Sequence, residues 1–314
     1  MLTRARPLVT IGLSTYNRAK SYLTKALQSA LSQTYPNLEI VVSDNCSTDG
    51  TEDLMRGVAD RRVRYFRQAK NIGATNNYNF CLQQARGAYF LLLHDDDVID
   101  EDFVEACLDA VDGDTRVGII RTGTRVIDGN GAVLATSPNG VGGLSTTDFM
   151  LGWFSGKTAL YLCSTLFNTA GLKGIGGFQS KTLVFQDVVA EMKLAAQYGR
   201  ADVAEVKASF RRHDDNRASA AKRQDWIEDS LFLLDVMCDV VPEDARERVR
   251  REGLAYFCRM NYRYVATIPS RSERLQAYRA VHKRFGYAYS PFRYIAKSYV
   301  RDLKWRVKRA LGRA

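Results

Sequence analysis

Three consecutive aspartates follow a continuous apolar run in the first third of the chain. They are Asp95, Asp96 and Asp97, and His94 stands directly before them. Adjacent carboxylates repel one another and shift each other's pKa values, and a divalent cation shared with phosphate groups relieves that repulsion. Because Mg²⁺ and Mn²⁺ prefer carboxylate oxygens, the cluster predicts a metal site beside a phosphorylated ligand. The alternative is a solvated acidic turn that caps the next helix, a role for which Asp100 is already placed.

Two other polar segments have the composition of a nucleoside site. Ser14 and Tyr16 follow one short apolar run, and Asp44 follows the next. A tyrosine ring can stack on a nucleobase, and the carboxylate of Asp44 can accept a hydrogen bond from an imide group. Serine, asparagine and aspartate also favour turns for local reasons, and turn chemistry is the simpler explanation of either segment alone.

A further acidic residue stands at the start of a predicted helix, where Gln186 and Asp187 follow the glycine-rich turn at 174–178. A carboxylate at this position is well placed to act as a general base. It is equally well placed to interact with the positive end of the helix dipole. Taken by itself, Asp187 is explained by the second role.

The segments before these groups predict the strands of one sheet. Short β-branched or aromatic runs alternate with helical patterns over the first 120 residues, in the order βαβαβαβα. This order indicates an α/β fold with a doubly wound, mainly parallel sheet. Ligands bind such sheets at the edge formed by the carboxyl ends of the strands. The predicted strands are 8–13, 38–43, 63–67 and 89–93, and the predicted helices include 20–32, 74–85 and 101–110.

The rest of the chain predicts a different organisation. Residues 117–165 predict short strands separated by loops at 128–131 and 138–143, and a helix is expected at 187–198. Beyond residue 217 the pattern is almost wholly helical. We therefore expect a first domain over 1–219 and a helical C-terminal subdomain over 220–314. Its predicted helices are 223–240, 244–264, 271–284 and 291–311.

The joint order and spacing of these groups resemble those of glycosyltransferase family 2, whose members have the GT-A fold. The similarity is carried by VTIGLSTYNRAKSYLTKALQSALSQTYPNLEIVVSDNCSTDGT at 9–51, LLLHDDDVIDEDF at 91–103, GIGGF at 174–178 and RRHDDNRAS at 211–219. It covers about residues 9–220 and is most specific over the first 105. The resemblance implies a GT-A domain with a nucleotide-sugar half at about 1–120 and an acceptor half at about 121–219.

The resemblance also implies roles for the matching positions. Asp187 matches the family's catalytic base, and Gln186 replaces the glutamate that usually precedes it. His94 stands where family members commonly have an aspartate, so Asp96 is expected to be the principal metal ligand. The other matching positions are Ser14, Tyr16, Asp44 and Asp95 for the nucleoside, Asp97 and His213 for the Mn²⁺ or Mg²⁺ ion, and Gly176, Gly177 and Arg217 for the donor sugar and diphosphate.

The reaction that this resemblance implies is a single displacement. Asp187 would deprotonate an acceptor hydroxyl, which attacks the anomeric carbon opposite the diphosphate and inverts its stereochemistry. The metal would offset the charge that develops on the departing diphosphate. We expect a nucleotide-sugar donor, with UDP as the most frequent nucleotide in the family. The expected acceptor is a glycan or polyprenyl-linked saccharide in surface polysaccharide synthesis.

The positive charge is concentrated near the C-terminal end. The 314 residues carry a formal net charge of +10, but residues 271–314 alone contain thirteen Lys and Arg against two acidic residues. The remainder is almost neutral, so no nucleic-acid partner is expected. At about 100° per residue, 291–311 forms an apolar face beside a basic stripe. This pattern predicts a helix that lies on a membrane surface or packs against its own domain.

Other features bear on location and class. The longest apolar run, 88–93, is too short to span a bilayer, and no secretory signal is predicted. A cytoplasmic location is expected, peripheral on the inner face of the cytoplasmic membrane if the tail binds lipid. Six cysteines without paired spacing predict reduced thiols. A nucleotidyltransferase is disfavoured because 14–18 lacks glycine, and a non-catalytic relative is disfavoured by the intact acidic cluster.

Overall fold

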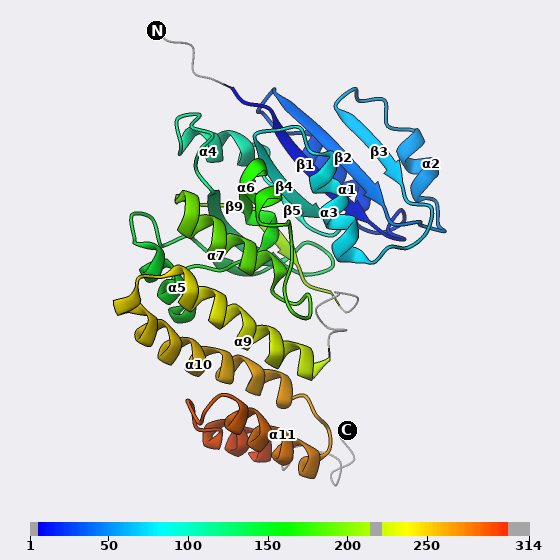
Figure 1. Ribbon diagram of the computed structural model, residues 1–314. Helices are drawn as coiled ribbons and strands as arrows, with labels where there is room; N and C mark the ends of the chain where they lie inside the picture. Colours follow the sequence, from blue (N-terminus) through cyan, green and yellow to red (C-terminus); the bar gives the residue numbers. More distant parts are fainter. Residues whose placement is uncertain (1–5, 214–221, 301–314) are drawn as a thin grey trace. The chain divides into compact units, whose positions relative to one another are not determined.

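The protein comprises two compact units, residues 1–219 and 220–314. The computed structural model describes residues 6–213 and 222–300 (Figure 1). The first unit contains a nine-stranded sheet, and the second consists of helices. Arg217 and the predicted helix beyond residue 300 lie outside the described residues.

The first half of the sheet has the predicted alternation of strands and helices. Four parallel strands lie in the order β3-β2-β1-β4, and Figure 1 shows β1, β2 and β3 side by side in blue. The bounds are β1 Val9–Thr15, α1 Leu23–Leu31, β2 Leu38–Asp44, α2 Thr51–Arg56, β3 Val63–Arg67, α3 Ala74–Gln84 and β4 Tyr89–His94. All seven residues of β1 and all seven of β2 are buried. Burial on both faces explains why these strands read as apolar runs rather than as alternating patterns.

The second half of the first unit completes the sheet in the order β4-β8-β6-β9-β5, and β7 pairs with β6. The bounds are β5 Val98–Ile99, α4 Phe103–Asp109, β6 Ile119–Ile127, β7 Val133–Ser137, α5 Thr146–Ser155, β8 Thr165–Asn168, α6 Thr169–Gly174, α7 Gln186–Tyr198 and β9 Arg200–Arg211. Strand β8 is antiparallel to both β4 and β6, so β6 and its parallel partner β9 run in the direction of β1–β4. The mainly parallel α/β sheet predicted from the sequence is therefore confirmed.

Two strands of this half, β5 and β9, and two helices, α5 and α6, were not predicted from the sequence. Helix α4 lies within the predicted range 101–110, but the Asp100 carboxylate does not cap it and instead accepts a hydrogen bond from Arg125 of β6 at 2.6 Å. In β9 the burial pattern is irregular, since the strand lies between β6 and the two-residue β5. Period-two alternation, the signal for a strand, is consequently absent there.

The second unit is a set of packed helices, α9 Arg223–Val240, α10 Glu243–Val265 and α11 Arg271–Arg284, followed by helical residues 292–300. Trp226 of α9 stacks on Tyr264 of α10 with ring centroids 4.4 Å apart. The hydroxyls of Tyr278 and Ser298 are 3.1 Å apart, so residues 292–300 contact α11. Among the described helices, none is both long enough and apolar enough to cross a bilayer.

Candidate active site

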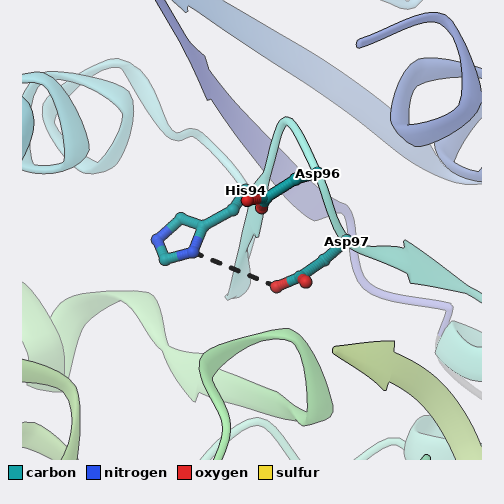
Figure 2. A group of neighbouring side chains, drawn as sticks. All are labelled: His94, Asp96 and Asp97. Carbon is teal, nitrogen blue, oxygen red and sulfur yellow. Dashed lines mark ion pairs between the residues drawn. The ribbon is translucent and has the colours of Figure 1, made fainter. Parts of the chain in front are cut away.

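The acidic cluster lies in the turn that follows β4, at the carboxyl edge of the parallel strands. Potential ligand atoms of His94, Asp96 and Asp97 lie within 4.8 Å of one another. Figure 2 shows the three side chains around this turn, with His94 Nδ1 and Asp97 Oδ2 3.9 Å apart. One imidazole and two carboxylates form a suitable donor set for Mn²⁺, which accepts both nitrogen and oxygen ligands.

Strand β9 holds Asp97 in place. The backbone N–H of Arg211 donates to Asp97 Oδ1 at 2.8 Å, and Arg211 Nε donates to the carbonyl oxygen of Asp96 at 2.8 Å. Asp97 is almost completely buried. Burial, followed by the neighbouring charge of Asp96, raises the pKa of Asp97 well above its usual range. A carboxylate in this environment gains from any cation that replaces its proton.

His213 reaches the cluster from the residues that follow β9. Its Nε2 lies 2.9 Å from Asp96 Oδ2. The ring of Tyr22 lies beside it, with centroids 5.0 Å apart, and the Arg211 guanidinium lies 4.8 Å from the same tyrosine ring. The structure thus brings together Asp96 and His213, which were both predicted as metal ligands and are 117 residues apart in the sequence.

Asp95 points to the loop after β1 rather than to His94. Its Oδ2 accepts a hydrogen bond from the backbone N–H of Tyr16 at 3.2 Å, and Arg18 Nε lies 4.0 Å from its Oδ1. Burial and the Asp96 charge raise the pKa of Asp95 to about 7, against the lowering effects of Thr15 and Arg18. Asp95 therefore joins the β4 turn to the segment predicted to bind a nucleoside.

Asp44 is at the end of β2, as predicted, but its carboxylate is completely buried. Its Oδ1 accepts from the backbone N–H of Ser47 at 2.8 Å, and its Oδ2 accepts from the hydroxyl of Tyr65 at 2.7 Å. Burial and this hydrogen bond raise the pKa of Tyr65. The sequence analysis did not identify Ser47 and Tyr65 as partners of Asp44. The signal for Tyr65 is the register of β2 and β3, which places it opposite Val42, two residues before Asp44.

The loops after β1 and β2 are joined by hydrogen bonds. Asn17, at a φ of 56°, donates its backbone N–H to Ser47 Oγ at 2.9 Å and accepts from the N–H of Thr48 at 2.8 Å. Ser14 is buried in β1 between Ser43 of β2 and His94 of β4, whereas Tyr16 is 45% exposed. Of the residues predicted to bind the nucleoside, Tyr16 is thus the one that offers an aromatic face to a ligand.

Asp187 lies in the first turn of α7 and is half-buried, while Gln186 is buried. One turn further along the same helix, Glu191 is buried against β6 and β8. Its Oε2 lies 3.3 Å from Arg121 Nε, and its Oε1 accepts from Thr165 Oγ1 at 2.9 Å. Burial raises the pKa of Glu191 to about 7, with Arg121 acting to lower it and Asp187 to raise it. No local pattern in the sequence indicates this pair, since its members are distant in the chain.

Replacing Arg121 with methionine is expected to destabilise the protein by about 3–5 kcal/mol, because it leaves the Glu191 carboxyl buried without its cation. Adding Glu191→Gln should recover part of this loss, since the two substitutions act on one contact. Urea unfolding measures both effects. Arg116→Met removes the exposed partner of Asp114 and serves as the control, with an unchanged midpoint expected. Equal midpoints for Arg121→Met and the control would contradict the prediction.

The glycine turn at 176–177 is held against α3 by hydrogen bonds between Asn79 and Phe178. Gly176 and Gly177 have φ values of 85° and 79°, and a Cβ on Gly177 would lie 2.4 Å from Asn79 Oδ1. Asn79 accepts from the backbone N–H of Phe178 at 2.9 Å and donates to its carbonyl oxygen at 3.1 Å. The backbone conformation and the contact with α3 both require glycine at position 177, independently of any bound sugar.

Gly177→Ala is expected to lower the free energy of unfolding by more than the ~1–2 kcal/mol that a left-handed backbone costs an L-residue. The excess comes from the clash with Asn79. Gly156→Ala is the matched control, because Gly156 has a φ of 82° and no atom lies within 4 Å of the position that its Cβ would occupy. Thermal unfolding of the two variants compares the costs, and equal losses would show that the contact with Asn79 contributes nothing.

The mainly parallel sheet, with the acidic cluster at its carboxyl edge, gives the first unit the arrangement of the GT-A fold. Residues 10–165, which lie within the first unit, match the model of Glycosyl transferase family 2. A solved structure, S. aureus TarS 1–349, is similar with a TM-score of 0.67 and 18% identity, over 90% of this chain and 80% of that one. The mannosyltransferase PcManGT from Pyrobaculum calidifontis, in complex with GDP-Man and Mn²⁺, has a TM-score of 0.52 and 19% identity, over 95% and 88%.

Sequence relatives are similar over shorter stretches. The Escherichia coli chondroitin synthase is 35% identical over 42% of this chain and 19% of its own length. The putative teichuronic acid biosynthesis glycosyltransferase TuaG of Bacillus subtilis is 34% identical over 34% of this chain and 43% of its own. The Escherichia coli β-1,3-glucosyltransferase WfaP is 38% identical over 29% and 36%. The aligned region thus spans less than half of each of these relatives.

Proposed function

We propose that this chain is a glycosyltransferase that moves a sugar from a nucleotide diphosphate donor to a hydroxyl of a glycan or lipid-linked acceptor. The observation that carries the proposal is the cluster of His94, Asp96 and Asp97 after β4, with His213 in contact with Asp96, in a domain whose residues 10–165 match family 2. This edge is where open α/β sheets bind ligands. The loops after β1 and β2, with exposed Tyr16, supply an adjoining surface for the nucleoside.

A divalent cation, Mn²⁺ or Mg²⁺, fits the side chains at this site. Two carboxylates and a histidine converge there, and burial raises the pKa values of Asp95 and Asp97, so a cation would relieve an electrostatic cost already present. Asp96, Asp97 and His213 would hold the cation. His94 could also be a ligand, because its ring nitrogen lies within 4.8 Å of carboxylate oxygens of Asp96 and Asp97. When bound, such an ion supplies charge stabilisation for a departing diphosphate.

The chain's own residues would perform the remaining steps. Asp187 takes the proton from the acceptor hydroxyl, whose oxygen then forms the new bond to the anomeric carbon as the bond to the diphosphate breaks. A single displacement inverts the configuration of that carbon. Glu191 lies one turn after Asp187 on α7, and its ion pair with Arg121 holds this part of the helix in place. Tyr16 and Asp95 orient the nucleoside side of the donor.

The donor is proposed to be a UDP-sugar, and the acceptor to belong to surface polysaccharide synthesis. A TarS structure in complex with UDP-GlcNAc supports the first part, although the archaeal neighbour was solved with GDP-Man. The name of WfaP gives UDP-Glc as donor and a GlcNAc-diphosphoundecaprenol as acceptor, and TuaG is named for teichuronic acid biosynthesis. These names support a saccharide acceptor, lipid-linked or polymeric.

A donor screen tests the proposal. The thermal midpoint of the full chain is measured with Mn²⁺ and each of UDP, dTDP, GDP and CDP, and then with the matching nucleotide sugars. A ligand at about 100 times its dissociation constant adds ~2.7 kcal/mol of stability, which is readily detected. We expect a metal-dependent rise with UDP and its sugars. A rise with another nucleotide would correct the donor, and no rise with any would favour a non-catalytic relative.

The exposed side chains of helical residues 292–300 support the further proposal of a membrane-surface contact. Phe292, Tyr299 and Val300 are 78%, 51% and 50% exposed, and Arg293 and Lys297 are exposed beside them. Exposed apolar side chains flanked by basic ones suit the interface of an anionic bilayer. Ser298, which contacts Tyr278, faces the opposite way.

Phe292→Ser is expected to weaken binding to anionic vesicles by about tenfold, because the buried area of one aromatic side chain contributes ~1.5–3 kcal/mol. Co-sedimentation with vesicles that contain phosphatidylglycerol measures it. Tyr198→Ser, which removes an exposed aromatic residue from α7, is the control and should bind as the wild type does. Undiminished binding of Phe292→Ser would exclude this helix as the contact.

A further inference from the structure

A hollow lies at the amino ends of the parallel strands, whereas the acidic cluster lies at their carboxyl ends. It has a volume of about 660 Å³ and is open to solvent. It is formed at the amino end of β2, at the segment that leads into β3 and at the turn between α3 and β4. Its charged lining consists of Glu39, Asp60, Arg61, Arg62, Arg64 and Arg86. The lining thus contains four arginines and two acidic residues.

Both carboxylates are already neutralised by two of these arginines. Asp60 accepts from Arg62 Nη2 at 2.8 Å and from its Nε at 3.1 Å. Glu39 Oε2 accepts from Arg64 Nη1 at 3.0 Å, and its Oε1 accepts from Thr10 Oγ1 and from the backbone N–H of Arg86, both at 2.7 Å. The acidic side chains therefore leave no carboxylate for the remaining two arginines.

Those two arginines are Arg61 and Arg86. Both are exposed, and within residues 6–213 and 222–300 neither guanidinium has a hydrogen bond or a close ion pair. A guanidinium is always charged and binds phosphate in a bidentate geometry. With four arginines against two acidic residues, the lining of the hollow has a net charge of +2, and Arg61 and Arg86 are carried by segments that precede different strands.

The hollow is separate from the candidate active site. Strand β2 begins at Leu38, which lines the hollow, and ends at Asp44, beside the nucleoside loops. A strand rises about 3.3 Å per residue, so the seven residues of β2 place these ends ~20 Å apart. A diphosphate bound at the acidic cluster cannot also occupy the hollow.

We propose that this hollow is a second anion site, which binds a phosphate monoester. The net charge of +2 of the lining matches the charge of a phosphate monoester, about −1.5 to −2 at neutral pH, better than that of a carboxylate. The volume lies in the range of small-molecule sites, about 300–1,000 Å³, and accommodates a phosphorylated monosaccharide as well as free phosphate. The proposal does not depend on the glycosyltransferase activity.

Isothermal titration calorimetry of the full chain with inorganic phosphate and, separately, with glucose 6-phosphate tests this site. EDTA is present so that no metal holds phosphate at the acidic cluster, and the ionic strength is constant. The variant is Arg61→Ala with Arg86→Ala. The matched control, Arg56→Ala with Arg116→Ala, removes two exposed arginines that do not line the hollow.

We expect the wild type and the control to bind with one site, and the Arg61/Arg86 variant to bind at least tenfold more weakly. Tighter binding of glucose 6-phosphate than of phosphate would identify a phosphorylated small molecule as the ligand, and equal binding would identify the phosphate group alone. The proposal would be overturned if no binding were seen at about 10 mM, a concentration roughly ten times the dissociation constant of a weak, millimolar site. Equal binding by the variant and the wild type, or equal weakening in the control, would also overturn it. Competition by UDP would also overturn it, because the anion would then occupy the donor site.

Discussion

Asp187→Asn is expected to lower kcat by about 10²- to 10⁴-fold, the range for loss of a positioned general base. Asparagine keeps the size of the side chain but cannot accept the proton of the acceptor hydroxyl at neutral pH. Because Asp187 lies on α7, outside the loops proposed to bind the nucleoside, the affinity for the donor nucleotide should remain near that of the wild type. Single-turnover transfer of a radiolabelled sugar measures the step directly.

Asp148→Asn is the matched control for this substitution. Asp148 occupies the first turn of α5, as Asp187 does in α7, and it is a helix N-terminal charge with no proposed chemical role. Its variant should transfer sugar at close to the wild-type rate. If Asp187→Asn were as active as Asp148→Asn, the carboxylate would be only a favourable helix charge, and the base would have to be sought elsewhere.

Asp96→Asn is expected to abolish the Mn²⁺-dependent rise in thermal midpoint and to reduce transfer by about 10²- to 10³-fold, the cost of losing one charge-stabilising group at a reacting centre. Asp96 accounts for the repulsion that helps to raise the pKa values of Asp95 and Asp97, and it is the carboxylate that contacts His213. Asp53→Asn, an exposed acid in the first turn of α2, is the control and should behave as the wild type does.

The rise in thermal midpoint caused by Mn²⁺ is expected to depend on pH. Burial and the Asp96 charge raise the pKa of Asp95 to about 7, so this carboxyl is largely protonated at pH 6, and the same causes raise the pKa of Asp97. A cation at the cluster favours the ionised carboxylates, and its affinity therefore rises as the pH increases through 7. We expect a larger Mn²⁺-induced shift at pH 8 than at pH 6. An equal shift at both values, or a full shift in Asp96→Asn, would show that the metal binds elsewhere.

The first half of the fold follows closely from local patterns in the sequence. Strands β1–β4 and helix α3 appear within two residues of their predicted bounds, because buried parallel strands are apolar throughout and turn residues separate them. Helices α9 and α11 also match their predicted bounds. Strand β9 was missed because its burial is set by the pairing with β6 and β5, which no local period reveals.

The chemical groups at the ends of the strands could be predicted from the order of residues along the chain. Asp95, Asp96 and Asp97 are contiguous and follow a buried strand, so their place at the carboxyl edge of the sheet follows from the chain direction alone. The order of these groups along the chain also carried the resemblance to family 2, which the family model confirms over residues 10–165.

The distant groups that complete the sites are brought together by tertiary pairing. Antiparallel pairing of β9 with β5, in which Val98 lies opposite Ser209, brings Arg211 to Asp97 and His213 to Asp96 across more than a hundred residues. The ion pair between Arg121 and Glu191 likewise depends on the packing of α7 against the sheet. These contacts arise from strand order and helix packing, and their partners have no fixed separation in the sequence, so no local spacing could predict them.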